Sequence, residues 1–111
     1  DEPMAGLDNR MREELLAVLD GLHARGITLL LATHDIDFAY RWADRIHLMA
    51  DGRCAASFDA AELPTRDTAL AAAGLPMPKV VELHRALVQR GLLAADSCPR
   101  SQPDLLALLE T

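Results

Sequence analysis

The pattern of apolar and polar residues changes most abruptly after residue 32. The apolar, β-branched run Ile27–Ala32 shows no alternation, which is typical of a strand buried on both faces of a parallel sheet. Three polar residues follow at once: Thr33, His34 and Asp35. Ligands of open α/β sheets bind at the carboxyl ends of strands. We therefore expect His34 at such an edge, with Asp35 capping the helix that follows.

Apolar residues recur at helical spacing in several other segments, and turn residues bound them. The predicted helices are Arg10–Arg25, Ile36–Ala43, a short turn from Asp59 to about Pro64, Arg66–Ala73, Pro78–Arg90 and a last helix through Leu105–Leu109. Asp8 or Asn9 would cap the first helix, and Gly26 would end it. The sequence Ser101-x-x-Asp104 is a capping-box pattern before the last helix.

Two short strands are predicted between these helices. The predicted strands are Arg45–Met49 and Cys54–Phe58. They flank Asp51-Gly52, the strongest two-residue hairpin signal in the chain. The order of elements makes residues 1–58 an α/β region and residues 59–111 a helical region. The predicted fold class is therefore α/β with a parallel sheet, followed by a small helical extension.

Composition narrows the possible functions. The 111 residues suggest one domain, and the net charge of −6 argues against a protein that follows nucleic-acid phosphates. No apolar run approaches the roughly 20 residues of a membrane span. Cys54 and Cys98 form no C-x-x-C motif, which favours a reducing compartment over a disulfide scaffold.

Two acidic residues stand at the start of the sequence. The chain starts with Asp1-Glu2-Pro3, and we expect Asp1, Glu2 and His34 to meet at one sheet edge. The strand that would deliver Asp1 to that edge is not in the sequence. We therefore expect these residues to be a piece of a longer protein.

Together these motifs resemble the carboxyl-terminal half of an ABC-type ATP-binding subunit, a P-loop NTPase. The resemblance rests on Asp1 to Asp8, on Thr33-His34-Asp35, and on the later Ala43-Asp44-Arg45 and Asp51-Gly52-Arg53. In that family, Asp-Glu ends the Walker B strand, the segment through Leu-Asp is the D-loop, and Thr-His-Asp is the switch loop. The resemblance assigns residues 1–58 to the ATPase domain and residues 59–111 to a helical carboxyl-terminal extension.

The resemblance also implies roles for four residues. Asp1 would hold Mg²⁺, usually through water, and Glu2 would orient and polarise the attacking water. His34 would hydrogen-bond the γ-phosphate of ATP, and Asp8 would reach across a dimer interface. The sequence has no G-x-x-x-x-G-K-[ST] phosphate loop and no Gly-Gly signature. We therefore expect ATPase activity in the longer protein, and none in these residues alone.

The second half is similar to the tail of energy-coupling-factor importers for cobalt or nickel. The similarity lies in Ala73-Gly74-Leu75-Pro76-Met77-Pro78 and the helix after it. It implies a peripheral protein at the cytoplasmic membrane face, with a second ATP-binding subunit and a membrane permease as partners, and no nucleic acid.

Two other functions remain open. The chain could belong to an ABC-type ATPase with no transport role, or it could be a truncated, non-enzymatic interaction module. His34 could also be a structural histidine, and Trp42 is more simply explained as a core residue than as a platform for a nucleotide base. The sequence upstream of Asp1 would discriminate among these alternatives.

Overall fold

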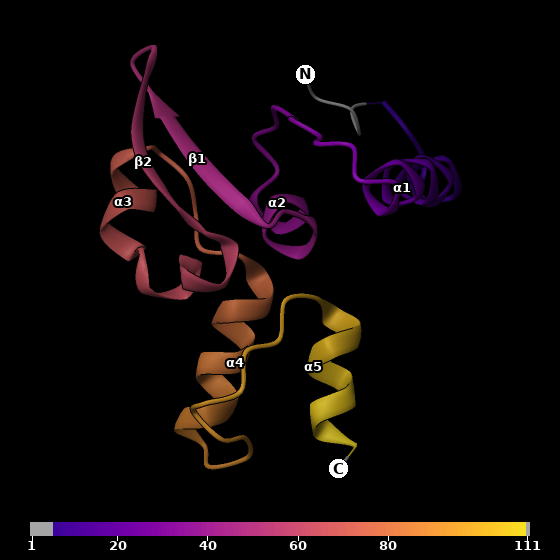
Figure 1. The fold of residues 1–111 in the computed structure, drawn as a ribbon. Helices are drawn as coiled ribbons and strands as arrows, with labels where there is room; N and C mark the ends of the chain where they lie inside the picture. The colour runs from indigo at the N-terminus through magenta and orange to yellow at the C-terminus, as the bar shows by residue number, and fades with distance from the viewer. Residues whose placement is uncertain (1–5, 111) are drawn as a thin grey trace. The chain divides into compact units, whose positions relative to one another are not determined.

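The computed structural model describes residues 6–110 and divides the chain into two compact units, 1–34 and 35–111. The predictions on Asp1 and Glu2 lie outside the described residues. Each unit is described by itself, and Figure 1 shows the elements in chain order.

The first unit consists mainly of one helix, α1 (Asn9–Ala24), close to the predicted bounds. Asp8 caps its start, and its end is a Schellman turn in which Gly26 has a φ of +85°. There the N–H of Gly26 donates to His23 O and the N–H of Ile27 donates to Leu22 O. The apolar face of α1 contains no buried residue, and 59% of Val18 is exposed.

The predicted strand at Ile27–Ala32 is wrong for this structure, which shows no strand there. The segment is irregular, and Leu30 is 87% exposed. A strand is stable only when neighbouring strands take up its backbone hydrogen bonds. The residues that the structure describes pair no strand with this segment.

The second unit begins with helix α2 (Ile36–Trp42), followed by strands β1 (Arg45–Ala50) and β2 (Arg53–Asp59). The strands form the predicted antiparallel hairpin, with Asp51 and Gly52 at its turn. The predicted class is confirmed only in part, because the sheet found in residues 6–110 is this two-stranded antiparallel one rather than a parallel sheet.

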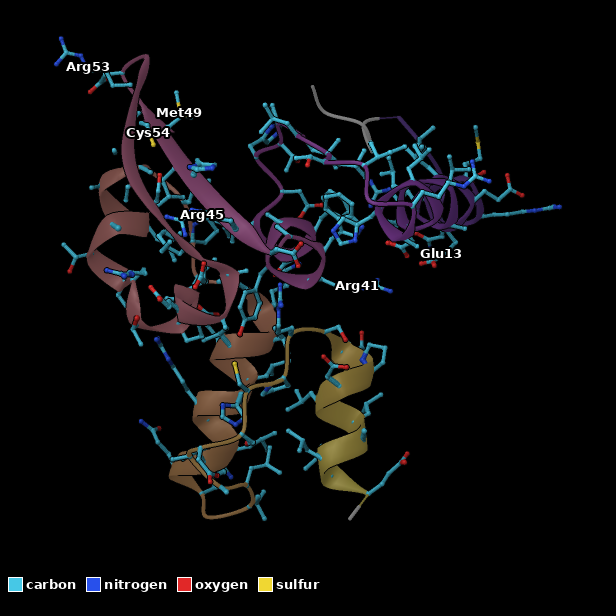
Figure 2. The ribbon with its side chains drawn as sticks, viewed as in Figure 1. Glu13, Arg41, Arg45, Met49, Arg53 and Cys54 are labelled. Atoms are coloured by element: carbon cyan, nitrogen blue, oxygen red, sulfur yellow. The ribbon has the colours of Figure 1, made fainter. Side chains whose placement is uncertain are left out.

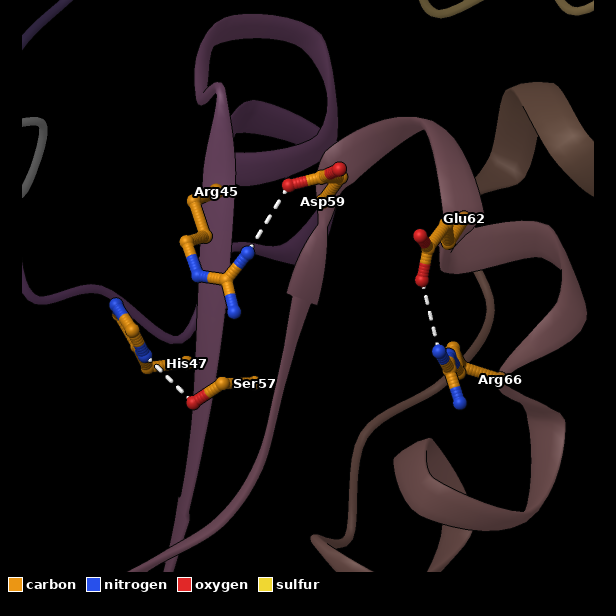
Figure 3. Close-up of polar contacts among 6 residues, drawn as sticks. All are labelled: Arg45, His47, Ser57, Asp59, Glu62 and Arg66. Carbon is orange, nitrogen blue, oxygen red and sulfur yellow. Dashed lines mark hydrogen bonds and ion pairs between the residues drawn. The ribbon is translucent and has the colours of Figure 1, made fainter.

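One face of the hairpin is apolar and the other is polar. Ile46 and Phe58 are paired across the strands and buried. On the opposite face, Arg45 pairs with Asp59 at 3.0 Å, and His47 Nδ1 lies 2.7 Å from Ser57 Oγ (Figure 3). This alternation is the period-two pattern of a sheet that packs on one side only.

Four helical elements follow the hairpin. They are η1 (Ala60–Thr65, a 3₁₀-helix), α3 (Asp67–Ala72), α4 (Lys79–Gln89) and α5 (Gln102–Leu109). Asp59 occupies the N-cap position of η1, but its side chain makes no capping hydrogen bond. Its carboxylate is instead bound by Arg45, the residue paired with it across the hairpin.

The core of the second unit joins both halves of its sequence. Its largest fully buried side chains are Tyr40, Leu63, Leu70 and Pro78. The same cluster contains apolar residues of the hairpin and of the last two helices: Ile46, Leu48 and Phe58, Val80 and Val81 of α4, and Leu105 of α5. The hairpin and the helical segment after residue 59 therefore share one apolar core.

Candidate functional site

Two of the four predicted site residues, Asp8 and His34, lie in the described part of the chain, and both belong to the first unit. Asp8 Oδ1 accepts a hydrogen bond of 2.9 Å from the N–H of Met11. The Asp8 carboxylate is thus the N-cap of α1, which fixes where this helix begins. The sequence predicted a cap at Asp8 or Asn9, and the structure has it at Asp8. The D-loop role of Asp8 stays a prediction.

His34 is exposed and precedes the first helix of the second unit in the chain. Its neighbour Asp35 is the N-cap of α2, with Oδ1 accepting a 3.1 Å hydrogen bond from the N–H of Phe38. The prediction that Asp35 caps this helix is confirmed. The Thr-His-Asp motif therefore lies where an irregular segment enters a helix.

Helix α2 and its C-cap residue Ala43 make polar contacts with residues far along the chain, which the sequence patterns did not reveal. Asp37 Oδ1 accepts a hydrogen bond of 2.7 Å from the backbone N–H of Lys79. The guanidinium group of Arg100 donates to the carbonyl oxygens of Tyr40 and Ala43. The hydroxyl group of Tyr40 lies 3.4 Å from Cys98 Sγ.

The environment of Tyr40 raises the pKa of its phenol well above the usual range. Burial is the main cause, and the hydrogen bond with Cys98 acts in the same direction. The ring is fully buried beneath the guanidinium group of Arg100, whose Cζ lies 5.5 Å from the ring centroid. The phenol therefore stays protonated and serves as a structural contact.

A shallow hollow of about 280 Å³ opens beside Tyr40 and is lined by residues of η1, of α4 and of the segment before α5. Within it, His84 Nε2 lies 2.7 Å from Ser97 Oγ, and Ser97 donates its own proton to Ala94 O. His84 is therefore the donor to Ser97, which is the wrong direction for activating a serine nucleophile. Arg85, also in the lining, is paired with Asp67, so its charge is compensated.

The described residues do not form a metal site. Among residues 6–110, no three His, Cys, Asp or Glu side chains come together in a way that could hold a metal ion. The Asp8 carboxylate already caps a helix. The magnesium role therefore depends on Asp1, which lies outside the described residues. Within the same range, no helix is long and apolar enough to cross a membrane.

Comparison with known proteins shows which proteins the chain is similar to. A protein of Streptomyces coelicolor, provisionally named as an ABC transporter ATP-binding protein, is 45% identical over 111 residues, covering 99% of this chain and 39% of that protein. An energy-coupling factor transporter ATP-binding protein of Methanospirillum hungatei is 36% identical over 110 residues, covering 99% of this chain and 28% of that protein. No family model matches the chain.

The chain is therefore homologous, over nearly its whole length, to ABC transporter ATP-binding proteins. Its relatives include a cobalt import ATP-binding protein of Rhodobacter capsulatus, which is 45% identical over 83 residues, covering 75% of this chain and 30% of that protein. The resemblance inferred from the motifs is thus confirmed. The chain spans well under half the length of each of these relatives.

Proposed function

We propose that these residues are part of the ATP-hydrolysing subunit of an ABC-type importer, in which hydrolysis drives uptake of cobalt or nickel ions. The observation that carries the proposal is similarity over 99% of the chain to ABC transporter ATP-binding proteins, together with the cobalt import relative. The subunit would lie at the cytoplasmic face of the membrane, pair with a second ATP-binding subunit and bind a membrane permease.

In this proposal Asp1 holds Mg²⁺ through water, and Glu2 orients the attacking water and accepts its proton. His34 hydrogen-bonds the γ-phosphate, and Asp8 contacts the second ATP-binding subunit. Asp8 and Asp35 each begin a helix by capping it, which sets the backbone around the D-loop and switch-loop segments. These caps support the proposal because each one fixes the backbone at the point where a motif segment meets a helix.

The phosphate-binding donors must come from elsewhere, because the 111 residues contain no phosphate loop. A calorimetric titration of residues 1–111 with ATP checks this point. Binding should be far weaker than in the longer protein that contains them. Micromolar binding by residues 1–111 alone would contradict the assignment of the phosphate site to a different segment.

The transport proposal is tested with the longer protein and its permease reconstituted in vesicles. ATP supplied on the side of the ATP-binding subunit should drive accumulation of radioactive cobalt or nickel, and the Glu2→Gln variant should abolish it. Hydrolysis that proceeds with no movement of either metal would overturn the choice of cargo and leave the ATPase assignment standing. Absence of hydrolysis in the complete complex would overturn both.

A further inference from the structure

Helix α2 is held at both ends by the carboxyl-terminal segment. At its first turn, Asp37 Oδ1 accepts a 2.7 Å hydrogen bond from the N–H of Lys79, the first residue of α4. At its last turn, Arg100 Nε and Nη2 donate to Tyr40 O at 2.9 and 2.7 Å, and Nη2 also donates to Ala43 O. These hydrogen bonds join Arg100 to Tyr40, which lies 60 positions earlier in the sequence, and to Ala43, which lies 57 positions earlier.

The contact made by Arg100 suits a helix end. The last carbonyl groups of a helix have no partner within the helix, and this end of the helix dipole attracts a cation. The planar fork of the guanidinium group reaches both carbonyl oxygens at once, while its Cζ atom lies over the Tyr40 ring. A lysine has a point charge and no such fork, so it would satisfy fewer of these acceptors.

Arg100 is itself held in place. Its backbone N–H donates to Asp104 Oδ2 at 3.1 Å, and the neighbouring Ser101 caps α5, with Oγ accepting from the N–H of Asp104. In a capping box the Asp104 carboxylate would accept a hydrogen bond from the backbone N–H of Ser101, but here it accepts one from the backbone N–H of Arg100. The start of α5 thus fixes the residue that binds the end of α2.

The other end of α2 leads to the switch-loop motif. The helix has seven residues, about two turns, and its N-cap is Asp35. His34 is the next residue toward the amino terminus. Since Asp35 begins this helix and His34 is bonded to Asp35, a shift of the helix at Tyr40 and Ala43 would also move the backbone at the point where the motif joins the helix.

We propose that Arg100 is a positioning residue that acts through α2 on His34. This inference depends on the proposed function, in which His34 contacts the γ-phosphate. Arg100 itself contacts no reacting group. Its role is to hold the helix that sets the backbone of the switch loop, so the helical extension contributes to hydrolysis although it carries none of the motif residues.

The test uses Arg100→Lys and Arg100→Gln in the longer protein, with Arg41→Gln as the control. Arg41 lies on α2 and is exposed (Figure 2), so the control alters an arginine of the same helix away from the contact. The first readout is amide hydrogen exchange over residues 35–43 without nucleotide. Exchange should become several-fold faster in both Arg100 variants and stay unchanged in Arg41→Gln. Unchanged exchange in both Arg100 variants would overturn the proposal.

The second readout separates positioning from general stabilisation. Single-turnover hydrolysis is measured for Arg100→Lys alone, His34→Ala alone and the double variant. We expect Arg100→Lys to slow hydrolysis several-fold with the KM for ATP unchanged. In the His34→Ala background, the same change should not slow hydrolysis further. Equal slowing in both backgrounds would show that Arg100 does not act through His34 and would overturn the inference. If the unaltered protein does not hydrolyse ATP, it is the proposed function that fails.

Discussion

The carboxylate of Asp37 accepts a hydrogen bond from the backbone N–H of Lys79, 2.7 Å away and 42 residues later in the sequence. The N–H groups of the first helical turn lack partners within the helix, and Pro78, the N-cap residue of α4, has no side-chain acceptor to offer. Asp37 therefore acts as a cap supplied by a different helix.

Asp37→Ala should lower the free energy of unfolding by about 1 kcal/mol, the usual effect of losing a helix cap. Urea denaturation followed by circular dichroism measures it. Asp96→Ala is the matched control, because Asp96 is an exposed loop residue, and it should have little effect. Equal stability of the two variants would show that the contact with Lys79 does not stabilise the fold.

Tyr40→Phe should change how stability depends on alkaline pH. The pKa of Tyr40 is raised by burial and by the hydrogen bond with Cys98, so the folded state holds the phenol proton more tightly than the unfolded chain. The stabilisation is complete below the unfolded pKa of about 10 and is lost as the pH rises above it. Denaturation midpoints measured near neutrality and at alkaline pH should fall more for the unaltered protein than for Tyr40→Phe. Parallel falls would contradict the assignment.

The Asp67→Asn substitution should change how stability depends on acidic pH. The hydrogen bonds from Arg85 lower the pKa of the Asp67 carboxyl group, so its stabilising effect is present above the ordinary aspartate pKa and is lost as the pH falls through the folded value. The melting temperature of Asp67→Asn should be slightly lower than that of the unaltered protein near neutrality, with the difference vanishing in acid. A difference that persists unchanged in acid would show that the Arg85 pair is not its origin.

Gly52→Ala should destabilise the hairpin by about 1 kcal/mol, because Gly52 has a φ of +74° and a left-handed backbone is costly for a residue with a Cβ atom. Gly21→Ala is the control with the same change of side chain. Gly21 lies inside α1, where a Cβ would meet no atom within 4 Å, so this variant should be neutral or stabilising. Chemical denaturation of the two variants should give opposite signs, and the same sign for both would contradict this reading of the turn.

Local sequence signals predicted local structure well. The caps at Asp8, Asp35 and Ser101, and the Asp51-Gly52 turn, are all found, because each depends on residues a few positions apart. The strand at Ile27–Ala32 was predicted wrongly, since a strand needs neighbours that its own residues cannot specify.

The contacts of Arg100 with Tyr40, and of Asp37 with Lys79, could not be predicted. They join residues far apart in the sequence, and no pattern of spacing marks them. The site was inferred differently, from the resemblance of its motifs to a family. That resemblance assigned roles to the Asp-Glu pair and to His34, which stay predictions, and it gave no indication of what holds α2.

Glu2→Gln in the longer protein tests the central claim most directly. The change keeps the size of the side chain and removes the negative charge that, in the proposed function, polarises the attacking water and accepts its proton. Glu13→Gln, at an exposed position on α1 (Figure 2), is the matched control. In a single-turnover assay beside an ATP titration, Glu2→Gln should slow hydrolysis by roughly 10²-fold or more with ATP affinity near that of the unaltered protein. Hydrolysis by Glu2→Gln at the unaltered rate would show that Glu2 is not the catalytic carboxylate.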